Sequence, residues 1–140
     1  MEQIAQIEKV LFLQRLKVFA HCSAGQVLRL AGIAKEQQFT AGEVIYRLND
    51  PPDCIYCVIE GKVKLDHPPK ETATAGENAA FGMLEILSGR LRLANATAQE
   101  DTLVLAIDAD DFFDLLSNNI EIVRGLFWLF SEAVTAPLAW

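Results

Sequence analysis

Residues 76–95 read GENAAFGMLEILSGRLRLAN and connect two β-rich halves of the chain. A loop that contains Gly and Asn runs into a short apolar helix, and Arg92 follows soon after that helix. Backbone amides at the start of such a helix can bind an anion, and a nearby arginine can add a bidentate charge. The stretch therefore predicts a small anion-binding pocket between two β-rich halves.

Helical patterns precede this stretch at the start of the chain. Apolar residues recur near helical spacing over 4–16, which predicts an amphipathic helix. Ser23 and Gln26 form a capping box for a second helix, which is expected to run to about Ala34. A pair of helices is therefore expected at the N-terminal end.

Short β-rich runs separated by turn residues make up the middle of the chain. Strands are predicted at 44–46, 54–59, 62–65, 93–98 and 102–107. The run 67–70 contains two prolines, which lack the donors that a strand ladder needs, so it is predicted to be a loop. Short, closely spaced strands favour an antiparallel β-roll or barrel.

Two more helices are predicted after the last strand. Asp108 and Asp111 indicate a helix start, and Ser117-Asn118-Asn119 indicates its end. The final helix is expected to end at Pro137. Its apolar stripe comprises Val123, Leu126, Phe127, Phe130 and Val134. The expectation is one mainly β domain over 1–140: N-terminal helices over 1–35, a roll over 36–107 with a short helix at about 79–88, and C-terminal helices over 108–136.

Several motifs in order resemble the cyclic nucleotide-binding domain family, of the cyclic-AMP receptor and protein-kinase regulatory-subunit type. They are AGEVI at 41–45, NDPPDCIYCVIEG at 49–61, FGMLEIL at 81–87 and RLAN at 92–95. The resemblance covers nearly the whole chain and implies an antiparallel jelly roll (double-stranded β-helix) with flanking helices. It also implies that residues 76–95 are a phosphate-binding cassette for cyclic AMP or cyclic GMP.

Carried over position by position, the resemblance implies a ligand site that departs from the family pattern. The site residues are Phe81, Gly82, Met83, Leu84, Arg92, Leu93, Ala94 and Asn95. Arg92 matches the arginine that pairs with the cyclic phosphate, and Gly82 and its neighbours match the backbone donors. Asn95 replaces the usual Thr or Ser.

Met83 stands where the family usually has the glutamate that binds the ribose 2′-hydroxyl, and a thioether is only a weak acceptor. Glu85 lies about 200° around the helix from Met83 and could serve only if the cassette were re-registered. Asn49 and Asn78 replace expected glycines, but Asn tolerates the left-handed conformation. These changes leave two interpretations open: a working sensor whose binding is weakened or redirected, and a degenerate domain.

Aromatic residues of the last helix have two interpretations. Trp128, Phe127 and Phe130 could form a lid over a purine, since the family often covers the base from its C-terminal helix. Aromatic residues at helical spacing are more often part of the core.

Composition excludes several other functions. The net charge of −7 with scattered Lys and Arg excludes nucleic-acid binding. The most apolar run, 125–130, is too short for membrane insertion. Cys54 and Cys57 fall on opposite faces of a strand, and His21 and His67 are the only histidines, so no metal site is expected. No nucleophile motif indicates an enzyme. Reduced thiols and the lack of a signal-peptide pattern favour the cytoplasm.

We therefore expect a regulatory domain that senses a small phosphate-containing ligand and needs no cofactor. Ligand binding would draw the C-terminal helices against the roll. The effector would be another part of a longer chain or another protein. The alternative is a structural or interaction module that binds no nucleotide and uses its last helix as an interface, with a homodimer as one form.

Overall fold

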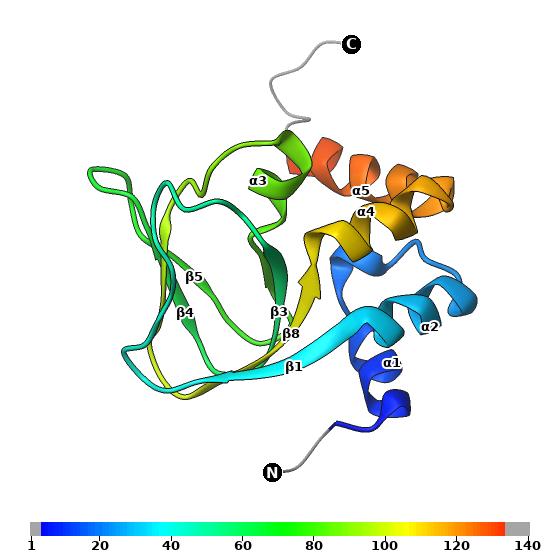
Figure 1. Cartoon of the computed structure of the whole chain (residues 1–140), viewed down its shortest axis with the longest axis horizontal. Helices are drawn as coiled ribbons and strands as arrows, with labels where there is room; N and C mark the ends of the chain where they lie inside the picture. Colours follow the sequence, from blue (N-terminus) through cyan, green and yellow to red (C-terminus); the bar gives the residue numbers. More distant parts are fainter. Residues whose placement is uncertain (1–3, 134–140) are drawn as a thin grey trace.

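Two four-stranded antiparallel sheets form the roll in this computed structural model, which describes residues 4–133 (Figure 1). The first sheet has the strand order β1 (Ala34–Phe39), β8 (Thr102–Asp108), β3 (Cys54–Glu60), β6 (Ala80–Phe81). The second has the order β2 (Val44–Tyr46), β7 (Asn95–Ala98), β4 (Val63–Asp66), β5 (Ala73–Ala75). The predicted mainly β fold with flanking helices is confirmed.

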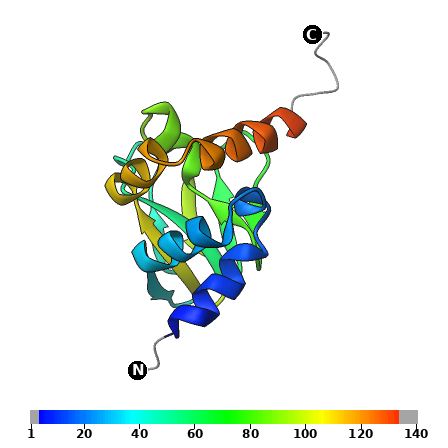
Figure 2. The same ribbon diagram turned by 90° about the vertical axis from the view of Figure 1, so that its right-hand side faces the viewer.

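Helices gather on one side of the roll (Figures 1 and 2). The helices α1 (Gln6–Gln14), η1 (Lys17–Phe19, a 3₁₀ helix) and α2 (Ala24–Ile33) precede the strands, and α4 (Ala109–Ser117) and α5 (Ile120–Ala133) follow them. The short helix α3 (Met83–Ser88) interrupts the strands and lies at the end of the roll next to α5. None of the helices within 4–133 is long and apolar enough to cross a membrane.

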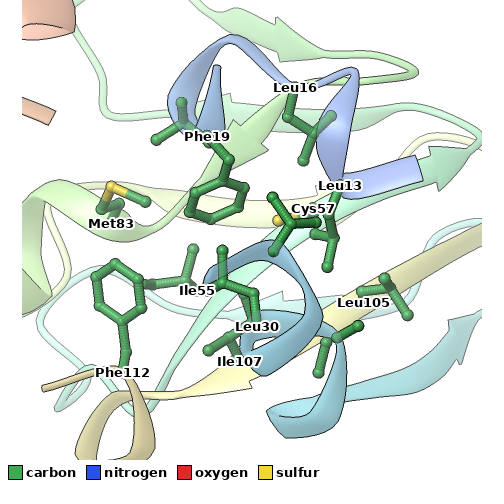
Figure 3. Close-up of a cluster of buried hydrophobic side chains, with 14 of the residues drawn as sticks. Leu13, Leu16, Phe19, Leu30, Ile55, Cys57, Met83, Leu105, Ile107 and Phe112 are labelled. Carbon is green, nitrogen blue, oxygen red and sulfur yellow. The ribbon is translucent and has the colours of Figure 1, made fainter. Parts of the chain in front are cut away.

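The core has two parts, one on each face of the first sheet. In β3, Ile55 and Cys57 face the helices, and Tyr56 and Val58 face the second sheet. Figure 3 shows the helix-side cluster, in which Cys57 lies among leucines of the N-terminal helices and residues of β8. Cys54 packs on the side of Tyr56, so the prediction that Cys54 and Cys57 fall on opposite faces is confirmed.

Local signals at two helix starts are confirmed. The amide of Gln26 donates to Ser23 Oγ (3.2 Å) and the amide of Ser23 donates to Gln26 Oε1 (2.8 Å). At α4, Asp108 Oδ1 accepts hydrogen bonds from the amides of Asp110 (2.9 Å) and Asp111 (3.2 Å). Side chains thus satisfy amides that the helices leave free.

Turn conformations agree with the sequence, since Asn49 and Asn78 have φ of 72° and 69°. Three strands are not among the predicted ones: β1 starts at Ala34, inside the region assigned to helices, β5 lies where no element was predicted, and β6 lies inside the predicted cassette helix. The cassette helix starts at Met83 instead of about 79, because residues 80–81 pair with β3. On α5, Leu126 is buried but Phe127 is 71% exposed, so the predicted stripe is not one buried face. Val134 and Pro137 lie outside the described residues.

Candidate functional site

The cassette is a strand and a helix joined at a single glycine. Gly82 lies between β6 and α3 with φ of +82°, a left-handed conformation that favours glycine. A Cβ atom there would come within 2.8 Å of Arg92 Nη1 and 3.4 Å of the Cys54 carbonyl oxygen. The joint therefore requires glycine for its conformation and also for the close approach of the arginine.

Arg92 is buried, although it carries a charge, with only 1% of its surface exposed. Its Nη1 donates to the Gly82 carbonyl (2.8 Å) and its Nη2 donates to the Cys54 carbonyl (2.7 Å). The guanidinium carbon lies 4.0 Å from the centre of the Tyr46 ring, within range of a cation–π interaction. The arginine that the sequence singled out is therefore fixed against the cassette.

Two carboxylates contact the same guanidinium, and they differ in burial. Glu85 Oε1 accepts from Nη1 at 2.9 Å, and the Glu85 side chain is 10% exposed. Asp53 Oδ1 lies 3.5 Å from Nη2, and its side chain is 74% exposed. Exposed ion pairs are screened and contribute little, so Glu85 is the principal counter-charge of Arg92.

One donor of Arg92 is left over. Arg92 Nε is buried and has no hydrogen-bond partner among residues 4–133. Buried polar groups are rarely left unpaired. The site therefore has the capacity to donate one more hydrogen bond.

Aromatic rings from both sheets pack around the guanidinium. Tyr56 stacks on Phe81 (5.2 Å between centroids), and Tyr46 lies 6.2 Å from each of these two rings. Burial raises the pKa of Tyr56 to about 12 and also raises the pKa of Tyr46, with a further upward contribution from the Glu85 charge. Both phenols are therefore neutral near pH 7 and present uncharged surfaces to Arg92.

Met83 and Glu85 point to different places, as their spacing on a helix requires. Met83 is buried in the helix-side core with Phe19 and Phe112 (Figure 3). Glu85 is directed instead to Arg92. The structure thus brings together Arg92, Gly82 and Glu85, and it uses Met83 for packing.

The other predicted cassette residues have structural contacts. Asn95 Oδ1 accepts from the Leu48 amide at 2.9 Å and so holds the turn before β3. The main chain of Arg92 is bonded to that turn in both directions, to Asp50 (2.8 Å) and Asn49 (2.9 Å). Leu93 and Ala94 are half-buried and continue toward β7. The position of the Arg92 backbone is therefore set by the turn and does not depend on the guanidinium contacts.

A cavity of about 670 Å³ connects the cassette with the helices. It is lined by Arg15, Leu16, Lys17, Val18, Leu65, residues 78–85, Leu129 and Phe130. Trp128, one of the three aromatic residues considered as a lid, lies edge-on against His21 (4.6 Å). Phe130 is the aromatic residue of α5 that reaches the cassette cavity.

Sequence reasoning missed three contributors to the site. Asp53, Tyr46 and the Cys54 carbonyl all contact the guanidinium. The signal available was the acidic turn at 49–53, which leads directly into β3. Its position relative to the arginine follows from the sheet pairing and not from sequence spacing.

Comparisons with known proteins agree with this geometry. The family model described as "Cyclic nucleotide-binding domain" matches residues 36–119. The chain is 25% identical over 134 residues to the cAMP-dependent protein kinase regulatory subunit of Dictyostelium discoideum, covering 90% of this chain and 41% of that protein. It is 34% identical over 84 residues to a cyclic nucleotide-gated potassium channel of Mesorhizobium japonicum, covering 60% and 23%. The chain therefore spans less than half the length of these relatives.

Solved structures show the same fold. The regulatory domain of Toxoplasma gondii PKA, crystallised with cAMP, superposes with a TM-score of 0.78 at 20% identity, over 92% of this chain and 49% of that chain. The N-terminal domain of a transcriptional regulator from Streptomyces coelicolor superposes with a TM-score of 0.73 at 26% identity, over 88% and 91%. With the matched family model, these similarities support one conclusion: the chain belongs to the cyclic nucleotide-binding domain family.

Proposed function

We propose that this chain is the sensor domain of a larger protein, which binds cyclic AMP or cyclic GMP at the cassette and signals through its C-terminal helices. The observation that carries the proposal is Arg92, a buried cation held at the start of the cassette helix with an unpaired Nε donor. Arginine binds phosphate through paired donors, and a fixed guanidinium is already oriented for that contact. The ligand itself is the only small molecule that the proposal requires, and the domain acts by binding and not by catalysis.

The signal would pass from α3 to α5, which meet across apolar surfaces. A second cavity, of about 280 Å³, lies between them and is lined by Leu84, Leu87, Leu126, Phe127 and other residues of the two helices. A shift of α3 on ligand binding changes this packing, and ligands shift a protein toward the arrangement that they bind better. The effector is another part of a longer chain or another protein. The free thiols of Cys22, Cys54 and Cys57 support a cytoplasmic location.

The test is a thermal melt with and without cyclic AMP and cyclic GMP, combined with calorimetric titration. A ligand at a hundred times its Kd stabilises the folded state by about 2.7 kcal/mol, a rise of several degrees for a domain of this size. Arg92→Lys keeps a positive charge beside Glu85 but loses the planar fork, so we expect affinity to fall about ten-fold or more. The matched control is Arg90→Ala, an exposed arginine next to the cassette, which should bind as the unchanged protein does.

A protein that shows no stabilisation by either nucleotide at millimolar concentration would contradict the proposal. So would an Arg92→Lys variant that retains full affinity.

The alternative, an interaction module that binds no nucleotide, is favoured by one observation. Three large apolar side chains of α3 and α5 are exposed: Phe127 is 71%, Leu84 54% and Trp128 52% exposed. In this interpretation α5 is an interface for an effector or a second copy of the chain. Sedimentation decides on the second copy, since a monomer at high concentration excludes self-association.

A further inference from the structure

Four of the N–H donors of the Arg92 guanidinium already make hydrogen bonds within the protein. An arginine side chain has five N–H donors, two on each Nη and one on Nε. Nη1 contacts the Gly82 carbonyl and Glu85, and Nη2 contacts the Cys54 carbonyl and Asp53. A phosphate group that binds the guanidinium through two donors must therefore displace at least one protein acceptor.

Of these four acceptors, only the carboxylates of Asp53 and Glu85 can move aside for a phosphate, and Glu85 is the one whose displacement carries a large cost. The Gly82 and Cys54 oxygens belong to the main chain, and Asp53 is exposed and 3.5 Å away. Glu85 is a buried anion at 2.9 Å, carried by the cassette helix itself. It satisfies Arg92 with the same chemistry that a phosphate offers: a charged oxygen acceptor.

Electrostatics adds to this competition. A cyclic phosphate that approached Arg92 would bring a second negative charge beside Glu85, whose side chain is only 10% exposed. Like charges at short range in a poorly solvated site repel strongly. A ligand without a phosphate does not meet this cost.

We propose that Glu85 is an internal competitor of the ligand phosphate, which holds Arg92 and so sets the affinity and ligand preference of the cassette. The proposal rests on the sensor function proposed above. It also links binding to the signal: Glu85 lies on α3 two residues from Met83 in the core and next to Leu84, which faces α5. Displacing Glu85 from Arg92 therefore releases a contact that holds the helix next to α5.

The experiment compares Glu85→Gln with the unchanged protein by calorimetric titration with cyclic AMP and, separately, with adenosine. Glutamine keeps the size of the side chain and an oxygen acceptor, and it removes the charge. We expect cyclic AMP to bind about ten-fold or more tightly to Glu85→Gln, because a charged hydrogen bond no longer competes. The affinity for adenosine should not change, since adenosine carries no phosphate.

The matched control is Glu100→Gln, which makes the same change in net charge at an exposed position outside the cassette. It should bind cyclic AMP as the unchanged protein does. Circular dichroism and thermal melts of each variant verify that it is folded.

The outcomes separate the two proposals. Equal cyclic AMP affinity for the unchanged protein and Glu85→Gln overturns the role of Glu85 and leaves the sensor function intact. A gain for Glu100→Gln as large as for Glu85→Gln also overturns it, because net charge then explains the effect. If no variant, Glu85→Gln included, binds either compound at millimolar concentration, the sensor function fails and this inference fails with it. A gain confined to cyclic AMP and to Glu85→Gln supports both.

Discussion

Replacing Gly82 with alanine tests whether Arg92 is held at the cassette joint as the structure shows. A non-glycine residue in the left-handed conformation costs about 1–2 kcal/mol. The new Cβ would also lie 2.8 Å from Arg92 Nη1, and the buried arginine, packed on Tyr46, can move away only by weakening its own hydrogen bonds. Each hydrogen bond to a charged group contributes about 1.5–3 kcal/mol. We therefore expect Gly82→Ala to lower the free energy of unfolding by about 3–5 kcal/mol.

Gly89→Ala is the matched control. Gly89 ends the same helix with φ of +70°, and a Cβ there meets nothing within 4 Å, so only the conformational cost of about 1–2 kcal/mol applies. Urea unfolding with an unchanged m value gives both numbers, and an excess of about 2 kcal/mol corresponds to a difference in Tm of about 8 °C. If the two variants lose the same stability, Arg92 is not packed against Gly82 and the site described above is wrong.

Two further predictions concern the helices and the core. Gly125→Ala should fail to stabilise α5, because its Cβ would lie 2.9 Å from His21 Cβ. Gly32→Ala in α2 meets nothing within 4 Å and should stabilise the protein by about 0.5–1 kcal/mol. Urea unfolding of both variants measures the contrast, and an equal gain in stability would show that α5 is not packed closely on His21. Burial raises the pKa of the Cys57 thiol to about 12, so a thiol reagent at pH 8 should modify Cys57 only after unfolding. Because the folded state holds the Cys57 proton more tightly than the unfolded state does, the protonated thiol contributes fully to stability below about pH 9, and this contribution is lost as the pH rises toward 12. Modification of Cys57 in the folded protein at pH 8 would contradict the burial of this thiol.

Periodicity and turn chemistry predicted the strands in the interior of the sheets but not all of those at their edges. The strand β3 is an almost continuous apolar run because both of its faces are buried, each in a different half of the core. The edge strand β1 has the sequence AKEQQF, in which four central polar residues give no alternation, and it is defined by its pairing with β8 alone. The strands β5 and β6 are also edges and have three and two residues. Strands this short have too few residues for a periodic pattern, and each is defined by its pairing, β5 with β4 and β6 with β3.

For the site, the resemblance of the motifs identified Arg92, and helix geometry separated Met83 from Glu85. Which of the two would face Arg92 could not be predicted, because that depends on the direction in which the chain returns after Gly89. The structure shows that the return is fixed by main-chain bonds between Arg92 and the turn at Asn49 and Asp50. Glu85, which the sequence placed on the opposite side of the helix from the expected sugar site, is therefore the partner of Arg92.

The attachment of the cassette to the roll has an evolutionary consequence. Strand β6 pairs with β3 at only two positions, Tyr56 with Phe81 and Cys57 with Ala80, and it lies at the edge of its sheet. The long ladders that β8 forms with β1 and β3 do not pass through the cassette. Substitutions at exposed positions of the cassette can therefore change its surface while the pairing of the sheets is retained. One scaffold of this kind can diverge to recognise different molecules by exchanging a single short segment.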